Sequence, residues 1–131
     1  MKYLIDTGVW LWALDPYERL RPEVRRVLEA VDDDIFLSPV TTWEISIKLR
    51  LGKLNFPGPP DRTVREFMAQ QRLLPLPITH KHAAKVYDLP PHHNDPFDRM
   101  LIAQALTEEL TLISSDAMFK RYSVPLLWAG R

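Results

Sequence analysis

Short apolar runs that alternate with amphipathic stretches constrain the fold of this chain more than any other feature. The runs Tyr3–Ile5, Ile35–Leu37 and Thr111–Ile113 are typical of short buried strands. Between them, apolar residues recur three and four positions apart over Val24–Val31 and Phe97–Leu106, as on one face of a helix. Strands that alternate with helices form a mainly parallel sheet with helices on both faces. We therefore predict an α/β fold with a central, mostly parallel sheet of four to five strands flanked by helices.

The segment Trp43–Leu51 is ambiguous, because its apolar and polar residues alternate as they do in a strand. Its beginning favours a helix instead. Thr41 and Glu44 have the spacing of a capping box, and Ser38-Pro39 offers a second possible helix start. We predict a helix here, which places Glu44 in its first turn.

The composition supports one domain and excludes several kinds of site. At 131 residues and 46% hydrophobic content the chain can bury a core, and no repeat or linker divides it, so residues 1–131 are expected to form a single domain. Cysteine is absent, which excludes disulfides, thiol nucleophiles and Cys-ligated zinc. The 17 basic and 17 acidic residues cancel, so a polyanion must be held by a local patch.

No targeting or membrane segment is indicated. The sequence does not open with an apolar run behind a basic segment, and no stretch approaches the ~20 apolar residues of a membrane span. The lack of cysteine also fits an intracellular compartment. We expect a cytoplasmic protein with no membrane partner.

Four acidic residues follow predicted strands or begin predicted helices. Asp6 and Asp116 come after buried strands, whereas Glu44 and Asp98 lie in the first turns of helices. The carboxyl ends of parallel strands lie at one edge of a sheet, so the four acids can converge there. Clustered carboxylates repel one another unless a divalent cation lies between them, and Mg²⁺ and Mn²⁺ prefer such oxygen ligands. A site of this kind can activate water for displacement at a phosphate.

Each acid also has a purely structural interpretation. Glu44 is the third member of the capping box, Asp95 before a proline is typical of a helix N-cap, and Asp98 then occupies a position that the helix dipole favours. Asp116 can cap the final helical piece. Asp6 is harder to explain in this way, because an acid at the end of a buried strand needs a partner or a cation.

Four segments of the chain stand out together: Leu4-Ile5-Asp6-Thr7, Trp43 to Lys48 with Gly52-Lys53-Leu54, Asp95 to Ala105, and Leu112 to Asp116. They resemble the PIN-domain family, and most closely the ribonuclease toxins of the VapC type from bacterial toxin–antitoxin modules. The resemblance spans nearly the whole chain, and the run from Asp95 to Ala105 is its most specific piece. It implies a Rossmann-like α/β domain whose four acids bind Mg²⁺ or Mn²⁺ and hydrolyse RNA phosphodiester bonds.

The resemblance also implies roles for individual residues. The four acids of the family fall on Asp6, Glu44, Asp98 and Asp116. Our hypothesis is that Asp6 and Asp98 hold the principal metal, while the other two complete the cluster or orient the attacking water. Thr7 and Ser115 are expected to steady the carboxylates from a second layer of contacts. The family pattern favours Asp98 over Asp95 as the third acid, and a role for Asp95 stays open.

Lys48 and Arg99 are the candidate RNA contacts. Lys48 stands four residues after Glu44, a spacing that fits a helical ion pair as well as a phosphate contact beside the metal. Arg99 follows Asp98 and either binds RNA or pairs with an acid; pairing is favoured, because carboxylates are near.

The neighbouring histidines His92 and His93 invite a zinc interpretation. Adjacent residues rarely ligate one ion, so we interpret this segment as a solvated loop that precedes a helix.

Two other functions fit parts of the chain. Asp6-Thr7-Gly8 also matches the signature of aspartic proteases, but those are all-β proteins and this sequence predicts substantial helix. The main alternative is a catalytically inactive PIN-like module that binds or regulates proteins. The presence of all four acids argues against it.

Partners follow from the resemblance alone. It implies an RNA substrate, a cognate antitoxin protein and a homodimer. The sequence leaves the choice between Mg²⁺ and Mn²⁺ open, since both accept the same oxygen ligands.

Overall fold

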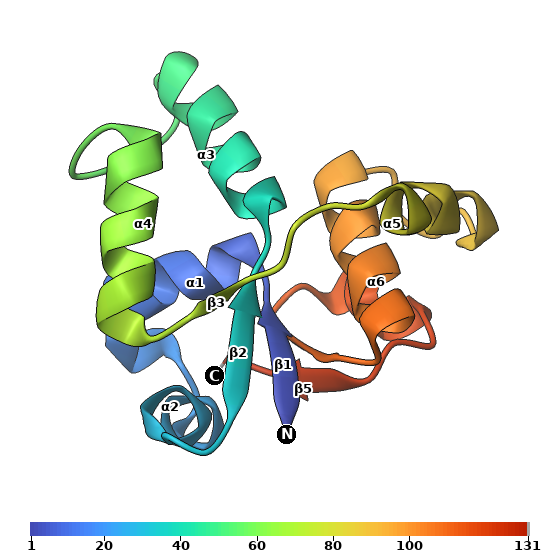
Figure 1. The fold of residues 1–131 in the computed structure, drawn as a ribbon, viewed down its shortest axis with the longest axis horizontal. Coiled ribbons are helices and arrows are strands. Elements are labelled where there is room, and N and C mark those ends of the chain that lie inside the picture. The colour runs from blue at the N-terminus through green and yellow to red at the C-terminus, as the bar shows by residue number, and fades with distance from the viewer. Residues whose placement is uncertain (131) are drawn as a thin grey trace.

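The computed structural model describes residues 1–130 as an α/β fold on a five-stranded parallel sheet (Figure 1). The strands are β1 (Lys2–Ile5), β2 (Asp34–Leu37), β3 (Leu74–Pro75), β4 (Thr111–Ser114) and β5 (Leu126–Trp128). The helices are α1 (Thr7–Leu14), α2 (Pro22–Glu29), α3 (Pro39–Arg50), α4 (Pro60–Gln71), α5 (His80–Lys85) and α6 (Pro96–Glu108). Short 3-10 helices span Tyr17–Arg19, Val86–Asp88 and Ala117–Arg121. The predicted fold class is confirmed.

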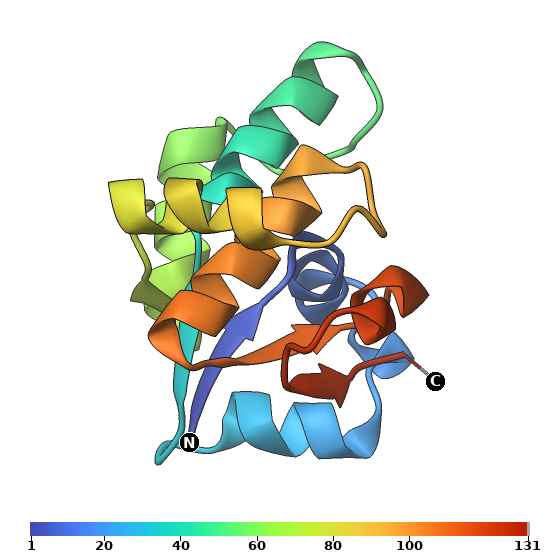
Figure 2. The ribbon, with the colours of Figure 1, turned by 90° about the vertical axis from the view of Figure 1, so that its right-hand side faces the viewer.

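Helices cover both faces of the sheet. In Figure 1, α1, α2 and α4 lie on one side, with α5 and α6 on the other, and Figure 2 shows α5 lying against α6. Because successive side chains of a strand point to opposite faces, β1 contributes to two cores. Tyr3 and Ile5 pack in one core with Trp10 of α1, whereas Leu4 packs in the other with Leu101 of α6.

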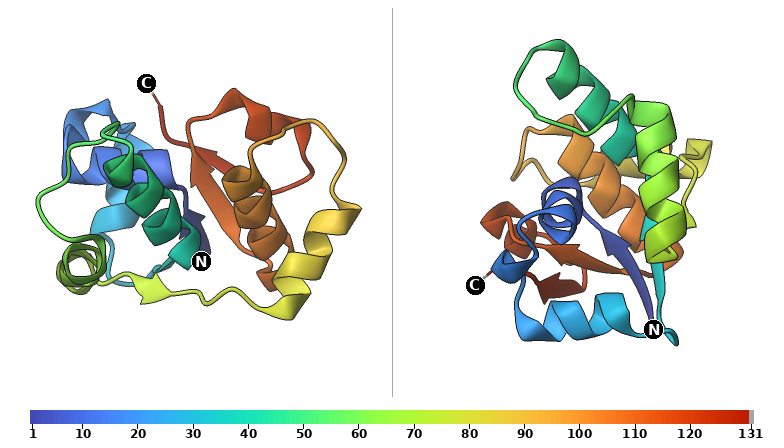
Figure 3. Two further views of the ribbon diagram at one scale, coloured as in Figure 1. Left: turned by 90° about the horizontal axis from the view of Figure 1, so that it is seen from above. Right: turned by 90° about the vertical axis from the view of Figure 1, so that its left-hand side faces the viewer.

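The order of the strands creates a switch point beside β1. The sheet has the order β3-β2-β1-β4-β5, so the chain winds outward from β1 in one direction and then returns to continue in the other. In doubly wound sheets, ligands bind at such a point, outside the carboxyl ends of the strands. Figure 3, seen from above, shows α3 and α6 on either side of β1 at this edge.

The segment Trp43–Leu51 is helical, as predicted, but α3 begins earlier than the capping box. Ser38 is the N-cap, and its side-chain oxygen accepts a hydrogen bond from the backbone nitrogen of Val40 at 3.1 Å. The predicted capping box at Thr41 is therefore wrong, and Glu44 lies in the second turn of α3 and not in its first. The strand-like alternation arises because α3 is apolar on two sides: Ile45 is fully buried, while Trp43 is 54% exposed.

Helix α6 is the most buried helix, as its apolar stripe predicts, with Leu101 to Ala105 all in the interior. It has 13 residues. Neither α6 nor any other helix within residues 1–130 is long and apolar enough to cross a membrane.

Candidate functional site

Asp6 is fixed at the end of β1 by backbone and side-chain contacts. Its N–H donates to the carbonyl of Ile113 in β4 at 3.0 Å, and its Oδ1 caps α1 by accepting from the nitrogen of Val9 at 2.7 Å. The side chain also accepts a hydrogen bond from Ser114 and is only 6% exposed. Burial raises the pKa of Asp6 to about 7, although the hydrogen bonds from the Ser114 side chain and the Val9 backbone both lower it.

Asp98 lies in the first turn of α6 and faces the same edge of the sheet. The side chain of Asp95 caps this helix, since its Oδ1 accepts from the nitrogens of Phe97 at 2.8 Å and Asp98 at 3.2 Å. The N-cap interpretation of Asp95 is confirmed. Burial raises the pKa of Asp98 to about 6, and the charges of Asp95 and Glu44 act in the same direction.

Asp116 and His93 complete a group with Asp98. Asp116 follows β4 and caps the last 3-10 helix through its Oδ1, which accepts from Met118 at 2.9 Å. Its Oδ2 lies 3.8 Å from the Nε2 of His93, and that nitrogen lies 2.7 Å from the Oδ2 of Asp98. One ligand atom from each of these three residues lies within 4.8 Å of the other two.

Glu44 reaches the site from α3. Its carboxylate is nearly buried, and its Oε2 accepts from the Nζ of Lys48 at 2.8 Å, which is the predicted helical ion pair. The charge of Glu44 raises the pKa of Asp98, and the charges of Asp98 and Asp116 raise that of Asp6. The four predicted acids therefore lie close enough to repel one another, at the switch point of the sheet.

Neither Thr7 nor Ser115 makes the carboxylate contact predicted for it in the part of the chain that the structure describes. Thr7 is buried, but its hydroxyl lies 3.0 Å from that of Thr41 and links α1 to α3. Ser115 lies against Gly130 and lines a hollow with Trp12, away from the carboxylates. The serine that hydrogen-bonds to a carboxylate, that of Asp6, is Ser114 and not Ser115.

The structure tests one of the two roles predicted for Arg99, pairing with an acid, and contradicts it. Its guanidinium donates to the carbonyl oxygens of Pro90 at 3.0 Å and His93 at 3.3 Å, and to the hydroxyl of Tyr122 at 3.3 Å. It also donates to the carbonyls of Val86 and Leu89. Arg99 thus holds the loop before α6 in shape, and pairing with an acid is not what the structure shows.

Sequence reasoning missed His93, whose segment was interpreted as a solvated loop. The side chain is only 18% exposed and lies between two of the acids. Its position five residues before Asp98, just ahead of the capped helix, was the available signal.

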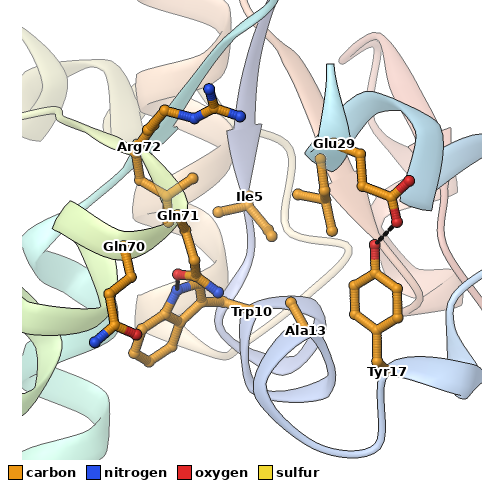
Figure 4. A pocket seen from close by; sticks show the side chains of 10 residues that line it. Ile5, Trp10, Ala13, Tyr17, Glu29, Gln70, Gln71 and Arg72 are labelled. Atoms are coloured by element: carbon orange, nitrogen blue, oxygen red, sulfur yellow. Dashed lines mark hydrogen bonds between the residues drawn. The ribbon is translucent and has the colours of Figure 1, made fainter. Parts of the chain in front are cut away.

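A separate cavity of about 340 Å³ lies between α1, α2 and the end of α4 (Figure 4). Trp10, Tyr17 and Gln71 line it, and none of the four acids does.

The acidic group has the donor chemistry of a divalent cation site. It offers carboxylate oxygens, which Mg²⁺ and Mn²⁺ prefer. Burial raises the pKa values of Asp6 and Asp98 by disfavouring their charged forms, and a bound cation would stabilise those forms.

Comparison with known proteins identifies the family of this chain. The PIN domain model matches residues 3–125. The chain belongs to the PIN-domain family. Ribonuclease VapC16 of Mycobacterium tuberculosis is similar to this PIN domain, with 39% identity over 62 residues. That match covers 47% of this chain and less than half, 44%, of the relative. The resemblance to the PIN-domain family and its VapC-type members is confirmed.

Solved structures share the fold over nearly the whole chain. The crystal structure of VapBC2 from Rickettsia felis, bound to a DNA fragment from their promoter, matches with a TM-score of 0.73 at 18% identity, covering 97% of this chain and 98% of that one. The DNA-bound VapBC structure from Salmonella typhimurium matches with a TM-score of 0.70 at 15% identity and covers 97% of each chain.

Proposed function

We propose that this PIN domain is a metal-dependent endoribonuclease, acting as the toxin of a type II toxin–antitoxin module. The observation that carries the proposal is the convergence of Asp6 and Asp98 at the switch point, with both pKa values raised. Buried acids that lie this close to other acids fit a cation better than they fit helix capping alone. The similarity to a protein named Ribonuclease VapC16 supports RNA as the substrate class.

The chain's own residues would divide the work as follows. Asp6 and Asp98 hold a Mg²⁺ or Mn²⁺ ion, and Glu44 and Asp116 complete its surroundings or orient the attacking water. When bound, the ion supplies water activation and stabilises charge on the phosphate. The Ser114 hydroxyl helps to fix the Asp6 carboxylate, to which it donates a hydrogen bond. The hydroxyl is itself held in place, because its oxygen accepts from the backbone nitrogen of Asp116 at 3.1 Å.

Lys48 is the proposed contact to the RNA backbone. Its ammonium lies at the edge of the cluster beside Glu44, and its side chain is 44% exposed. It can therefore turn toward a phosphate without leaving a buried position. Arg99 is not included, since its donors are engaged by the loop before α6.

The proposed module also includes a cognate antitoxin and a homodimer, in the cytoplasm. The matched structures are of VapBC complexes, which supports an antitoxin partner. Trp43 and Ile47 on α3 and Leu51 at its C-cap form an exposed apolar stripe, which supports the formation of a protein interface.

The test is cleavage of a mixed RNA pool by purified protein with Mg²⁺ or Mn²⁺, with and without EDTA. We expect cleavage to be lost on chelation and in Asp98→Asn, which circular dichroism should show to be folded. Asp32→Asn, an exposed acid in the turn before β2, is the matched control and should cleave normally. Cleavage that survives both chelation and Asp98→Asn would contradict the proposal. No cleavage with either metal would favour the inactive, protein-binding alternative.

A further inference from the structure

We propose that His93 supplies a nitrogen ligand to the metal of this site and biases the site toward Mn²⁺ over Mg²⁺. The inference rests on the proposed function, because it presumes that the acidic cluster holds a divalent cation. It adds a fifth residue to the four acids and turns an open choice of metal into a prediction.

The first support is the position of the imidazole. Its Nε2 lies 2.7 Å from the Oδ2 of Asp98 and 3.8 Å from the Oδ2 of Asp116. Two ligands at adjacent corners of an octahedral ion, each about 2.1 Å from it, are about 3 Å apart. Distances of 2.7 and 3.8 Å bracket that value, so small side-chain rotations are enough for the three atoms to share one ion.

The second support is the way the loop presents His93. Tyr122 accepts from the backbone nitrogen of His93 at 2.9 Å, and Arg99 donates to its carbonyl oxygen at 3.3 Å. Tyr122 also donates to the carbonyl of Pro90 at 3.1 Å. Both backbone groups of His93 are therefore held from outside the loop, which keeps its backbone within reach of Asp98 and Asp116.

The third support is the chemistry of the mixed donor set. Mg²⁺ binds in proteins almost entirely through oxygen and gives up its waters reluctantly. First-row transition ions accept imidazole nitrogen as well. A site with carboxylates alone treats Mg²⁺ and Mn²⁺ alike, whereas one nitrogen ligand strengthens the binding of Mn²⁺ selectively.

The test measures metal binding without RNA, so it does not depend on cleavage. Free Mn²⁺ is followed by electron paramagnetic resonance, and Mg²⁺ affinity is obtained by competition, for the wild type, His93→Gln and His80→Gln. His80 is an exposed histidine at the start of α5 and serves as the matched control. We expect His93→Gln to weaken Mn²⁺ binding by roughly tenfold or more and Mg²⁺ binding by less than about threefold. A loss that is equal for the two metals, or no loss, would overturn the proposal.

Pulsed electron paramagnetic resonance of bound Mn²⁺ gives a direct signature. The wild type and His80→Gln should show coupling to an imidazole nitrogen, and His93→Gln should lack it. Tyr122→Phe keeps the ring but removes the hydroxyl that holds His93; it should retain the coupling and weaken Mn²⁺ binding in the same direction. A wild-type spectrum without nitrogen coupling, in protein that binds Mn²⁺ and cleaves RNA, would refute the role of His93 and leave the proposed function standing. If the wild type binds neither metal, both proposals fail.

Discussion

The acidic site and the cavity beside Trp10 differ in how their polar groups are satisfied. In the cavity the groups pair with one another: the indole Nε1 of Trp10 donates to Gln71 at 2.9 Å, and the hydroxyl of Tyr17 donates to Glu29 at 2.6 Å (Figure 4). At the acidic site Asp6 and Asp98 also have hydrogen-bond partners, but they are buried near other carboxylates, and burial raises the pKa of Asp6 to about 7.

The difference teaches that the size of a hollow is a poor guide to function in this protein. Two pairs that line the cavity, Trp10 with Gln71 and Tyr17 with Glu29, already have their hydrogen bonds made, and the first pair stabilises the packing of α1 against α4. The acidic site holds groups whose charge is disfavoured by burial, a feature that clusters at functional sites, and the proposed chemistry is assigned to it for this reason. Substitutions in the two regions should therefore have opposite consequences.

The largest expected effect is on cleavage in Asp6→Asn. Asparagine keeps the shape of the side chain and an oxygen that can accept from Val9, so α1 should remain capped. It removes a proposed metal ligand, and RNA cleavage should fall by about 10³-fold or more. Initial rates on one RNA pool would measure this. Cleavage within tenfold of the wild type would show that Asp6 is not a metal ligand required for cleavage.

The second effect is on the pH dependence of stability without metal. The folded-state pKa values of Asp6 and Asp98 are raised to about 7 and about 6. Between pH 4 and 7 the folded protein then binds more protons than the unfolded chain, so the free energy of unfolding should fall as the pH rises. The fall should amount to a few kcal/mol, at about 1.4 kcal/mol per pKa unit.

Urea unfolding in EDTA at pH 5 and pH 8 would measure that slope. Asp6→Asn should reduce the slope and be more stable than the wild type at pH 8. Added Mn²⁺ should stabilise the wild type more at pH 8 than at pH 5. Equal slopes in the wild type and Asp6→Asn would show that the pKa of Asp6 is the same in the folded and unfolded states.

The third effect belongs to the cavity. Trp10 is fully buried, and Trp10→Phe removes both part of the ring and the donor to Gln71. Stability should fall by about 2 kcal/mol, from lost packing and an unpaired amide. Metal affinity of the folded variant should stay within about twofold of the wild type, measured by titration with Mn²⁺. A tenfold loss would mean that the two regions are coupled through α1.

What the sequence predicted correctly depends on local contacts. The strands, the helix from Pro96 and its cap at Asp95 are each determined by residues within a few positions, and all are confirmed. The meeting of Asp6 with Asp98 was predictable as well, because a parallel sheet gathers its carboxyl ends at one edge.

The features that the sequence did not reveal depend on contacts between distant residues, or on which of two adjacent residues points toward the site. The loop that carries His93 is shaped by Tyr122, 29 residues further along the chain, and no periodicity in the loop reveals that contact. The two serines after Ile113 differ by one position, and adjacent side chains of an extended chain point to opposite sides. The prediction chose Ser115, and the contact to Asp6 is made by Ser114.

The smallest effect is expected in Tyr17→Phe, at the mouth of the cavity. The variant removes the hydrogen bond to Glu29 but keeps the ring, and both residues retain access to water. Water can replace the lost partner, so the free energy of unfolding should fall by only about 0.5–1 kcal/mol. Urea unfolding at pH 7 would measure this, with Tyr87→Phe, at a tyrosine that is 92% exposed, as the control. RNA cleavage by both variants should equal that of the wild type. Reduced cleavage in Tyr17→Phe alone would show that the cavity takes part in function, and the contrast between the two regions would then have to be abandoned.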